Sequence, residues 1–338
     1  MSRLQVVSGK GGTGKTTVAA ALALALAAEG KRTLLVEVEG RQGIAQLFGT
    51  EALPYEERKI AVAPGGGEVY ALAIDAELAL LDYLQMFYKL GAAGRALRKL
   101  GAIDFATTVA PGVRDVLLTG KACEAVRRKD RSGRSVYDHV VMDAPPTGRV
   151  TRFLNVNDEV AGLARMGPVH HQAQSVMRVI KSPETAVHLV TLLEEMPVQE
   201  TADGVEELRA AGLPVGNVLV NMVRPRLLDD DAVRAASAGG ARADAGGAVR
   251  APSGDRRADV ARALAAAGVG GAEQLVDPLF EQAAEHARRV ELEREQREAL
   301  AKLRVPMYEL PLLGGGVDLA GLYHLARELR RDLGVSDA

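Results

Sequence analysis

Short apolar runs recur along the chain and alternate with longer segments whose apolar residues have helical spacing. The runs cover residues 4–8, 34–38, 68–74, 136–142, 186–193, 215–221 and 305–310, and we expect each to be a β-strand. Most of them are apolar without strict alternation, which is typical of strands that have helices on both faces. The pattern predicts an α/β fold with a doubly wound, mostly parallel sheet.

Two stretches, 77–129 and 162–180, interrupt this alternation and contain helical patterns only. In the first stretch, leucines and one phenylalanine recur at the spacing of one helix face. Such helices either cover the sheet or form a subdomain that contacts another molecule. We expect a helical subdomain that is inserted into a single domain of residues 1–338.

Two further segments differ from the rest in composition. Residues 229–254 are almost entirely Ala, Gly, Arg, Asp and Ser, with little to bury, and we expect a flexible linker or loop. Residues 280–303 alternate acids with bases, which indicates a solvated helix rather than a nucleic-acid-binding arm.

Charge and cysteine content exclude several classes of function. The 338 residues include 42 Lys and Arg against 44 Asp and Glu, for a formal net charge of −2, so no nucleic-acid partner is expected. The single cysteine, Cys123, excludes an intramolecular disulfide and a cysteine-built metal cluster. A cysteine-poor chain without an early apolar leader is expected to be cytoplasmic.

Residues 9–16 read Gly-Lys-Gly-Gly-Thr-Gly-Lys-Thr and match the phosphate-binding pattern GxxxxGK[ST]. The motif follows a predicted strand and opens a predicted helix at 16–29, as this motif requires. Lys15 would reach the β- and γ-phosphates of a nucleotide and the Thr16 hydroxyl would hold Mg²⁺, so the expected cofactors are ATP and Mg²⁺. The expected nucleotide-binding residues of this loop are Gly11, Gly12, Thr13, Gly14, Lys15, Thr16 and Thr17.

The strand predicted at 136–142 leads directly into Asp143. An apolar strand that ends in Asp is the Walker B arrangement, in which the carboxylate orders Mg²⁺, usually through water. A strand-terminal Asp is common, so it supports this assignment only together with the phosphate-binding loop. The predicted metal ligands are Thr16 and Asp143.

Lys10, a second lysine near the start of the loop, makes the motif similar to the deviant Walker A motif of dimeric ATPases. In those proteins this lysine extends toward the partner's nucleotide. Residues 144–148, Ala-Pro-Pro-Thr-Gly, resemble switch II of the arsenical pump and tail-anchored-protein-targeting ATPases. The resemblance implies a P-loop ATPase of the bacterial form that works as a homodimer, or as a heterodimer with a related ATPase.

The same resemblance implies roles for residues outside the loop. Glu39 falls on the position of the family's aspartate that orients the attacking water, with a carboxylate one methylene longer. Asn221 lies where the family reads adenine, and Pro311 and Leu312 resemble the adenine-packing loop. The expected catalytic residues are Lys15, Lys10, Glu39 and Asp143.

Two departures from the family narrow the expected function. With one cysteine, the chain lacks the thiolates that sense metalloid in the arsenical pump ATPase. It also lacks the CxxC zinc clamp of many targeting ATPases. We expect a switch that hydrolyses ATP to drive or target a partner, by anion transport or by delivery of a membrane-protein client. The alternatives are a partitioning-type ATPase switch, which the balanced charge disfavours, and a weakly hydrolysing subunit of a heterodimer with a paralogous ATPase.

Overall fold

The computed structural model describes residues 2–88, 111–163, 168–240 and 254–332. Its contacts divide the chain into two compact units, Met1–Val223 with Leu303–Ala338, and Arg224–Lys302. Although the expectation of one domain over 1–338 stays a prediction, the second unit forms a compact body of its own. It is a helical insertion between two strands of the sheet, and the helices of this insertion pack against each other.

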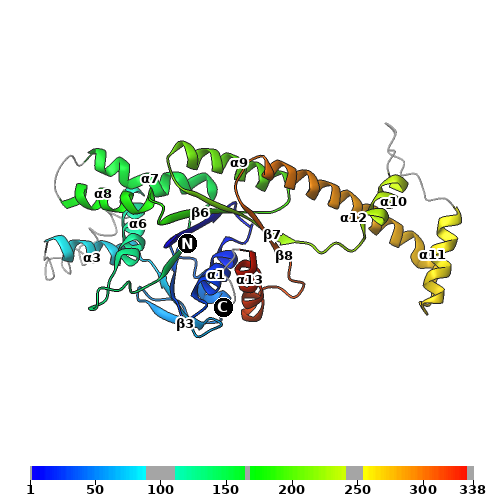
Figure 1. The fold of residues 1–338 in the computed structure, drawn as a ribbon, viewed down its shortest axis with the longest axis horizontal. Coiled ribbons are helices and arrows are strands. Elements are labelled where there is room, and N and C mark those ends of the chain that lie inside the picture. The colour runs from blue at the N-terminus through cyan, green and yellow to red at the C-terminus, as the bar shows by residue number, and fades with distance from the viewer. Residues whose placement is uncertain (1, 89–110, 164–167, 241–253, 333–338) are drawn as a thin grey trace. The chain divides into compact units, whose positions relative to one another are not determined.

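The first unit contains an eight-stranded sheet with the strand order β3-β4-β2-β5-β1-β6-β7-β8 (Figure 1). The strands are β1 (Leu4–Gly9), β2 (Arg32–Glu37), β3 (Arg58–Val62), β4 (Glu68–Ala73), β5 (His139–Asp143), β6 (Thr185–Thr191), β7 (Val215–Val223) and β8 (Met307–Pro311). All neighbouring strands are parallel except β3, which is antiparallel to β4. The predicted doubly wound, mostly parallel sheet is confirmed, and each of the seven predicted strands overlaps a strand of the structure.

Strand β3 has no counterpart among the predicted strands. Its sequence begins with Arg58 and Lys59, and most of its side chains are exposed, so it lacks the apolar run that marks the buried strands. It lies at the edge of the sheet, where lysine discourages pairing with another chain. An exposed edge strand therefore leaves a weaker pattern in the sequence than a central one.

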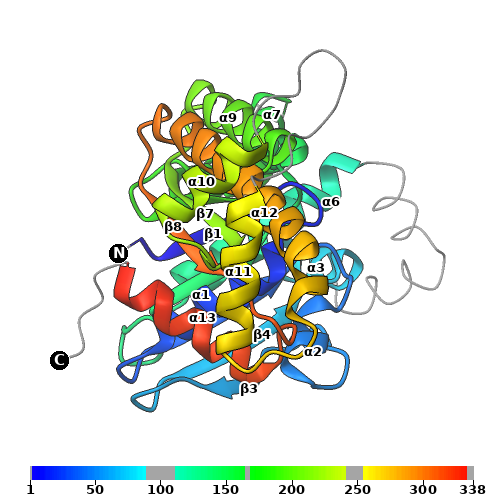
Figure 2. The same ribbon diagram turned by 90° about the vertical axis from the view of Figure 1, so that its right-hand side faces the viewer.

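Helices cover both faces of the sheet (Figures 1 and 2). The face that carries Val7, Leu35 and Val141 packs against α1 (Lys15–Ala27), α2 (Gly43–Phe48) and α13 (Leu319–Asp332). The opposite face, with Leu4 and Val140, packs against α6 (Pro111–Arg127), α7 (Thr147–Leu163), α8 (Pro168–Ile180) and α9 (Glu195–Ala210). Successive strand residues point to opposite faces, which explains why the strands are apolar throughout.

The predicted helical stretches contain α3 (Ala76–Tyr88), α6 and α8. Residues 89–110 and 164–167 of these stretches lie outside the described residues. Leu118 of α6 and Ile180 of α8 belong to the same apolar cluster as the sheet. In the described part of the chain these helices therefore cover the sheet, and their role as a separate subdomain stays a prediction.

The second unit consists of α10 (Asp230–Gly240), α11 (Gly254–Ala266) and α12 (Ala272–Ala301) in its described residues. The expectation of a loop over 229–254 is wrong for α10, while 241–253 lie outside the described residues. The Asp229 carboxylate accepts a hydrogen bond from Ala232 N at 2.7 Å. This cap and the high helix propensity of alanine favour a helix even where little is buried.

Helix α12 overlaps the charge-rich helix that the sequence predicts at 280–303. Arg294 pairs with Glu291 at 2.6 Å and with Glu298 at 2.8 Å along its surface. None of the helices in the described ranges has the length and the hydropathy needed to span a membrane.

Candidate functional site

Three chain segments that carry predicted site residues meet at the carboxyl edge of the sheet. Strand β5 lies between β1 and β2, and Asp143 is in register with Val7 on one side and with Glu37 on the other. The loop after β1 holds the phosphate-binding motif. Ligands of doubly wound sheets bind at this edge, so the topology brings the motif and Asp143 together.

The phosphate-binding loop requires glycine at two of its positions. A Cβ on Gly9 would lie 2.2 Å from the carbonyl oxygen of Val190. Gly14 has a φ of +84°, and a Cβ there would lie 2.4 Å from Asn221 Nδ2. Thr13 closes the turn, because its hydroxyl donates to the Lys10 carbonyl at 2.8 Å. Gly11 and Gly12 are exposed beside it.

Helix α1 begins at Lys15, so its first unpaired N–H groups lie at the end of the loop. Thr17 is half-buried in the first turn of this helix. The Thr16 hydroxyl donates to Asp143 Oδ2 at 2.7 Å, which joins the two predicted metal ligands directly.

Asp143 fits the role of a magnesium-ordering carboxylate. Its side chain is buried, and Oδ1 has no hydrogen-bond partner within the described structure. A hydroxyl and a carboxylate are the hard oxygen ligands that Mg²⁺ prefers. Among the described residues no three His, Cys, Asp or Glu side chains gather around a possible metal position. This arrangement suits an ion that is also held by substrate phosphates.

Burial raises the pKa of Asp143 to about 6, the Thr16 hydrogen bond and Lys15 lower it, and Glu37 and Glu39 raise it further. Because the folded-state pKa lies above the unfolded value, the nucleotide-free folded state holds an extra proton between about pH 4 and 6. We expect the free energy of unfolding to fall by about 2–3 kcal/mol as the pH rises across this interval, and then to level off. Denaturant titrations from pH 4 to 8 measure this.

The matched variant Asp143→Asn keeps an acceptor for Thr16 but cannot titrate, so it should lose this part of the pH dependence. The same proton competes with Mg²⁺, and Mg²⁺ should therefore support ATP binding more weakly below pH 6 than at pH 7.5. Identical pH profiles for the wild type and the Asn variant would refute the raised pKa.

The loop at 38–43, which we call switch I, is fixed to the end of β2. The buried Glu37 carboxylate accepts hydrogen bonds from Gln42 N at 2.5 Å and from Ile44 N at 3.2 Å. The Gln42 side chain exchanges two hydrogen bonds with the backbone of Leu53, at 2.7 and 3.2 Å. Both ends of the loop are therefore anchored.

Glu39 lies inside switch I, with 20% of its side chain exposed. Its charge acts on Asp143, so the structure brings the two predicted catalytic carboxylates close together. Arg41, in the same loop, has a guanidinium nitrogen 3.7 Å from Glu39 Oε2.

The segment at 144–149, which we call switch II, follows Asp143 and opens α7. Ser8, directly before the phosphate-binding loop, donates to the Pro145 carbonyl at 2.6 Å. Lys10 Nζ lies 2.7 Å from Glu200 Oε1, and Thr147 donates to the other oxygen of Glu200 at 3.4 Å. Glu200 of α9 thus links the phosphate-binding loop to switch II.

The predicted adenine-binding residues come together at the ends of β7 and β8. Val223 pairs with Pro311, and Leu312 N donates to the Val223 carbonyl at 2.8 Å. Leu312 is 40% exposed. Asn221 is buried, and its Nδ2 donates to the Thr13 carbonyl at 2.9 Å, so in this structure the amide supports the phosphate-binding loop.

Sequence reasoning missed Glu37 and Glu200. A charged residue within the apolar run at 34–38 is a signal for Glu37, because a carboxylate inside a central strand must find donors. Glu200 has no such signal, since it is one of many acids on the surface of a helix. Its contacts depend on how α9 packs beside β1.

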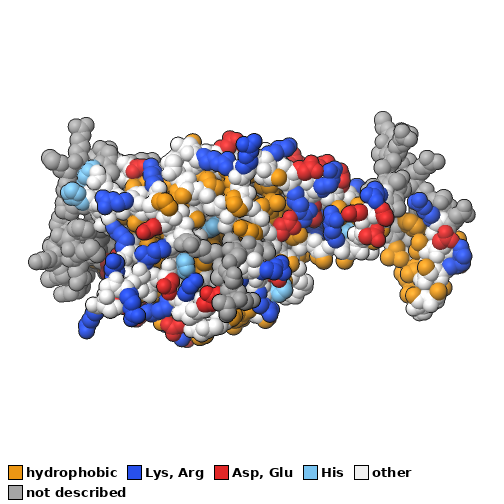
Figure 3. Space-filling model, in the orientation of Figure 1, with side chains coloured by type: hydrophobic (Ala, Val, Ile, Leu, Met, Phe, Trp, Pro, Cys, Tyr) orange, Lys and Arg blue, Asp and Glu red, His pale blue; other side chains and the backbone are white. Residues whose placement is uncertain are grey.

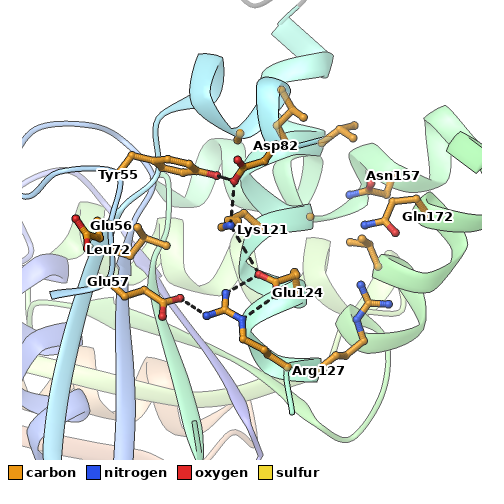
Figure 4. Close-up of a pocket in the computed structure, with 16 residues that line it drawn as sticks. Tyr55, Glu56, Glu57, Leu72, Asp82, Lys121, Glu124, Arg127, Asn157 and Gln172 are labelled. Carbon is orange, nitrogen blue, oxygen red and sulfur yellow. Dashed lines mark hydrogen bonds and ion pairs between the residues drawn. The ribbon is translucent and has the colours of Figure 1, made fainter. Parts of the chain in front are cut away.

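A cavity of about 910 Å³ lies away from the phosphate-binding loop (Figure 4). It is bounded by residues 55–57 and by helices α3, α6, α7 and α8. A chain of ion pairs crosses it, from Asp82 to Lys121 at 3.2 Å, Lys121 to Glu124 at 3.8 Å, Glu124 to Arg128 at 2.6 Å, and Arg128 to Glu57 at 2.6 Å. None of the predicted nucleotide-site residues lines this cavity.

Comparison with known proteins gives one family. The model of the anion-transporting ATPase family matches residues 2–182. ATPase BagA of Mycobacterium tuberculosis is 52% identical over 327 residues, which cover 97% of this chain and 92% of that protein. More distant relatives include ATPase GET3 of Kluyveromyces lactis, 26% identical over 64% of this chain and 71% of that protein.

The arsenical pump-driving ATPase of Acidiphilium multivorum is 27% identical over 68% of this chain and 41% of that protein. The matched family region contains the phosphate-binding loop, switch I and switch II, whose geometry is described above. The chain therefore belongs to the anion-transporting ATPase family, and it binds and hydrolyses ATP.

Proposed function

We propose that ATP binds at the carboxyl edge of the sheet, with its phosphates on the phosphate-binding loop and its adenine near Pro311 and Leu312. Lys15 contacts the β- and γ-phosphates, and Thr16 and Asp143 hold Mg²⁺, which when bound neutralises phosphate charge. The unpartnered oxygen of Asp143 and its 2.7 Å contact with Thr16 support this placement. Glu39 orients the attacking water.

We further propose that ATP joins two chains and that hydrolysis separates or relaxes them. The observation that carries this proposal is the position of Lys10. Its side chain is 31% exposed and its ammonium group pairs with Glu200, which also accepts a hydrogen bond from Thr147 of switch II. Because Lys10 is held only by a surface carboxylate, it is available to a second chain. Movement of switch II would weaken the contact between Glu200 and Lys10.

The cycle is proposed to drive a partner protein, by anion transport or by delivery of a membrane-protein client. The environment of Cys123 argues against metalloid sensing by a thiolate in this chain. Its side chain is fully buried, and burial raises the pKa of the thiol to about 12. A thiol that stays protonated at neutral pH is a poor ligand for soft metals.

The proposed dimer is tested by light scattering with MgATP, with MgADP and without nucleotide. The molar mass should double with ATP only. Lys10→Ala should weaken this association by about 10-fold or more, because it removes the positive charge that contacts the phosphates bound to the partner. Lys31→Ala is the matched control, since that lysine has 43% of its side chain exposed beside β2. A monomer in every nucleotide state would contradict the homodimer, and a dimer formed only with a related ATPase would identify the heterodimer.

A further inference from the structure

A small cavity of about 140 Å³ lies between switch I and switch II. Its wall includes Glu39, Arg41, Arg114, Asp115, Pro145 and Arg149. Two of these residues belong to switch I, two to switch II and two to the first turns of α6. Both switches therefore form part of its wall, and with the nucleotide placed as proposed above the cavity adjoins the γ-phosphate position.

Two arginines of this cavity, Arg41 and Arg149, make only loose ion pairs with its acids. Arg41 Nη2 lies 3.7 Å from Glu39 Oε2, and Arg149 Nη2 lies 3.9 Å from Asp115 Oδ1. Both distances are longer than those of a hydrogen bond, so N–H donors of the two guanidinium groups remain available to a ligand.

The environment of Asp115 indicates a local excess of positive charge. Burial raises the pKa of this carboxyl, although Arg149, Arg114 and Arg152 all act to lower it. The Asp115 carboxylate, with only 17% of its side chain exposed, lies 3.9 Å from Arg149 and shares the cavity wall with Arg114 and Arg41. An anion is the ligand that this field favours, and guanidinium donors match the oxygens of phosphate-like groups.

The cavity is small. Its volume of about 140 Å³ has room for one five-atom tetrahedral oxyanion. ATP hydrolysis produces one such anion, inorganic phosphate.

We propose that this cavity is an oxyanion site that holds inorganic phosphate after hydrolysis, as it leaves the γ-phosphate position for solvent. The proposal rests on the nucleotide placement given above. Arg149 and Arg114 supply the principal donors, and the Asp115 carboxylate opposes the anion. Because both switches line the site, bound phosphate keeps them in contact with the same ligand until it is released.

The site is tested by equilibrium dialysis of radiolabelled inorganic phosphate against the full chain with saturating MgADP. Arg149→Gln and Arg114→Gln should each raise the phosphate Kd by about 3- to 10-fold, because each removes a charged donor. Asp115→Asn should lower the Kd, since it removes a negative charge from the wall. Arg134→Gln is the matched control, because that arginine has 84% of its side chain exposed and lies outside the cavity.

The same series in a Lys15→Ala background without nucleotide separates this site from the phosphate-binding loop. Phosphate binding that persists there and still responds to Arg149→Gln supports the proposal, whatever the chain does with ATP. If Lys15→Ala abolishes phosphate binding, and the arginine changes have no effect in the chain that keeps Lys15, the proposal is overturned and the phosphate lies on the phosphate-binding loop. In single turnovers Arg149→Gln should also speed phosphate release, and an unchanged release rate would contradict the proposed hold on phosphate.

Discussion

Replacing Lys15 by alanine is expected to reduce Mg²⁺-dependent ATP turnover by about 100- to 1,000-fold. Lys15 stands at the start of α1, where its charge already lowers the pKa of Asp143. No other residue of the loop supplies a cation to the chain's own phosphates, because Lys10 is paired with Glu200. A coupled assay of ADP formation in excess MgATP measures the loss.

Lys59→Ala is the control for this experiment. Lys59 lies on the edge strand β3 and pairs with Glu68 of β4 at 2.7 Å. Lys59→Ala therefore changes the net charge as much as Lys15→Ala does, but at a place away from the nucleotide site. Lys15→Ala with turnover close to that of the wild type would show that catalysis occurs elsewhere.

Replacing Glu39 by glutamine is expected to slow hydrolysis by about 100-fold or more while ATP binding changes little. Glutamine has the size of glutamate but cannot accept a proton from water or attract it with a full charge. The geometry favours this role, because Glu39 lies in switch I and its charge acts on Asp143. Single-turnover cleavage and fluorescent-ATP binding separate the two effects.

Glu37→Gln is an informative contrast to this variant. Glu37 holds switch I through the N–H groups of Gln42 and Ile44 and is buried, so its replacement should lower the free energy of unfolding by about 1–3 kcal/mol. Glu39→Gln should leave stability nearly unchanged. If Glu39→Gln hydrolysed ATP as fast as the wild type, another group would have to position the water.

The central sheet and the phosphate-binding loop were predictable because each depends on a local pattern. Strands covered on both faces are apolar throughout, as in β1 and β5. The glycines of the loop are required by the backbone itself, as the 2.2 Å approach at Gly9 shows. Asp143 could be placed because a polar residue that ends a buried parallel strand lies at the ligand-binding edge.

The remaining features depend on contacts between distant segments. Strand β3 lies at an edge and is stabilised by pairing rather than by an apolar run. Helix α10 has alanine-rich composition that resembles a linker, although alanine favours helix formation. Glu200 and Lys10 belong to segments that are far apart in the sequence, and so do the arginines that meet between the switches. No spacing in the sequence indicates that they approach each other.

Specific ATPase activity as a function of chain concentration tests the central claim most directly. If Lys10 of one chain completes the nucleotide site of the other, turnover per chain should rise with concentration and then level off as dimers saturate. Lys10→Ala should flatten this curve, while Lys31→Ala should follow the wild type. Turnover per chain that stays constant over the whole range, in a protein that remains monomeric by light scattering, would contradict the account.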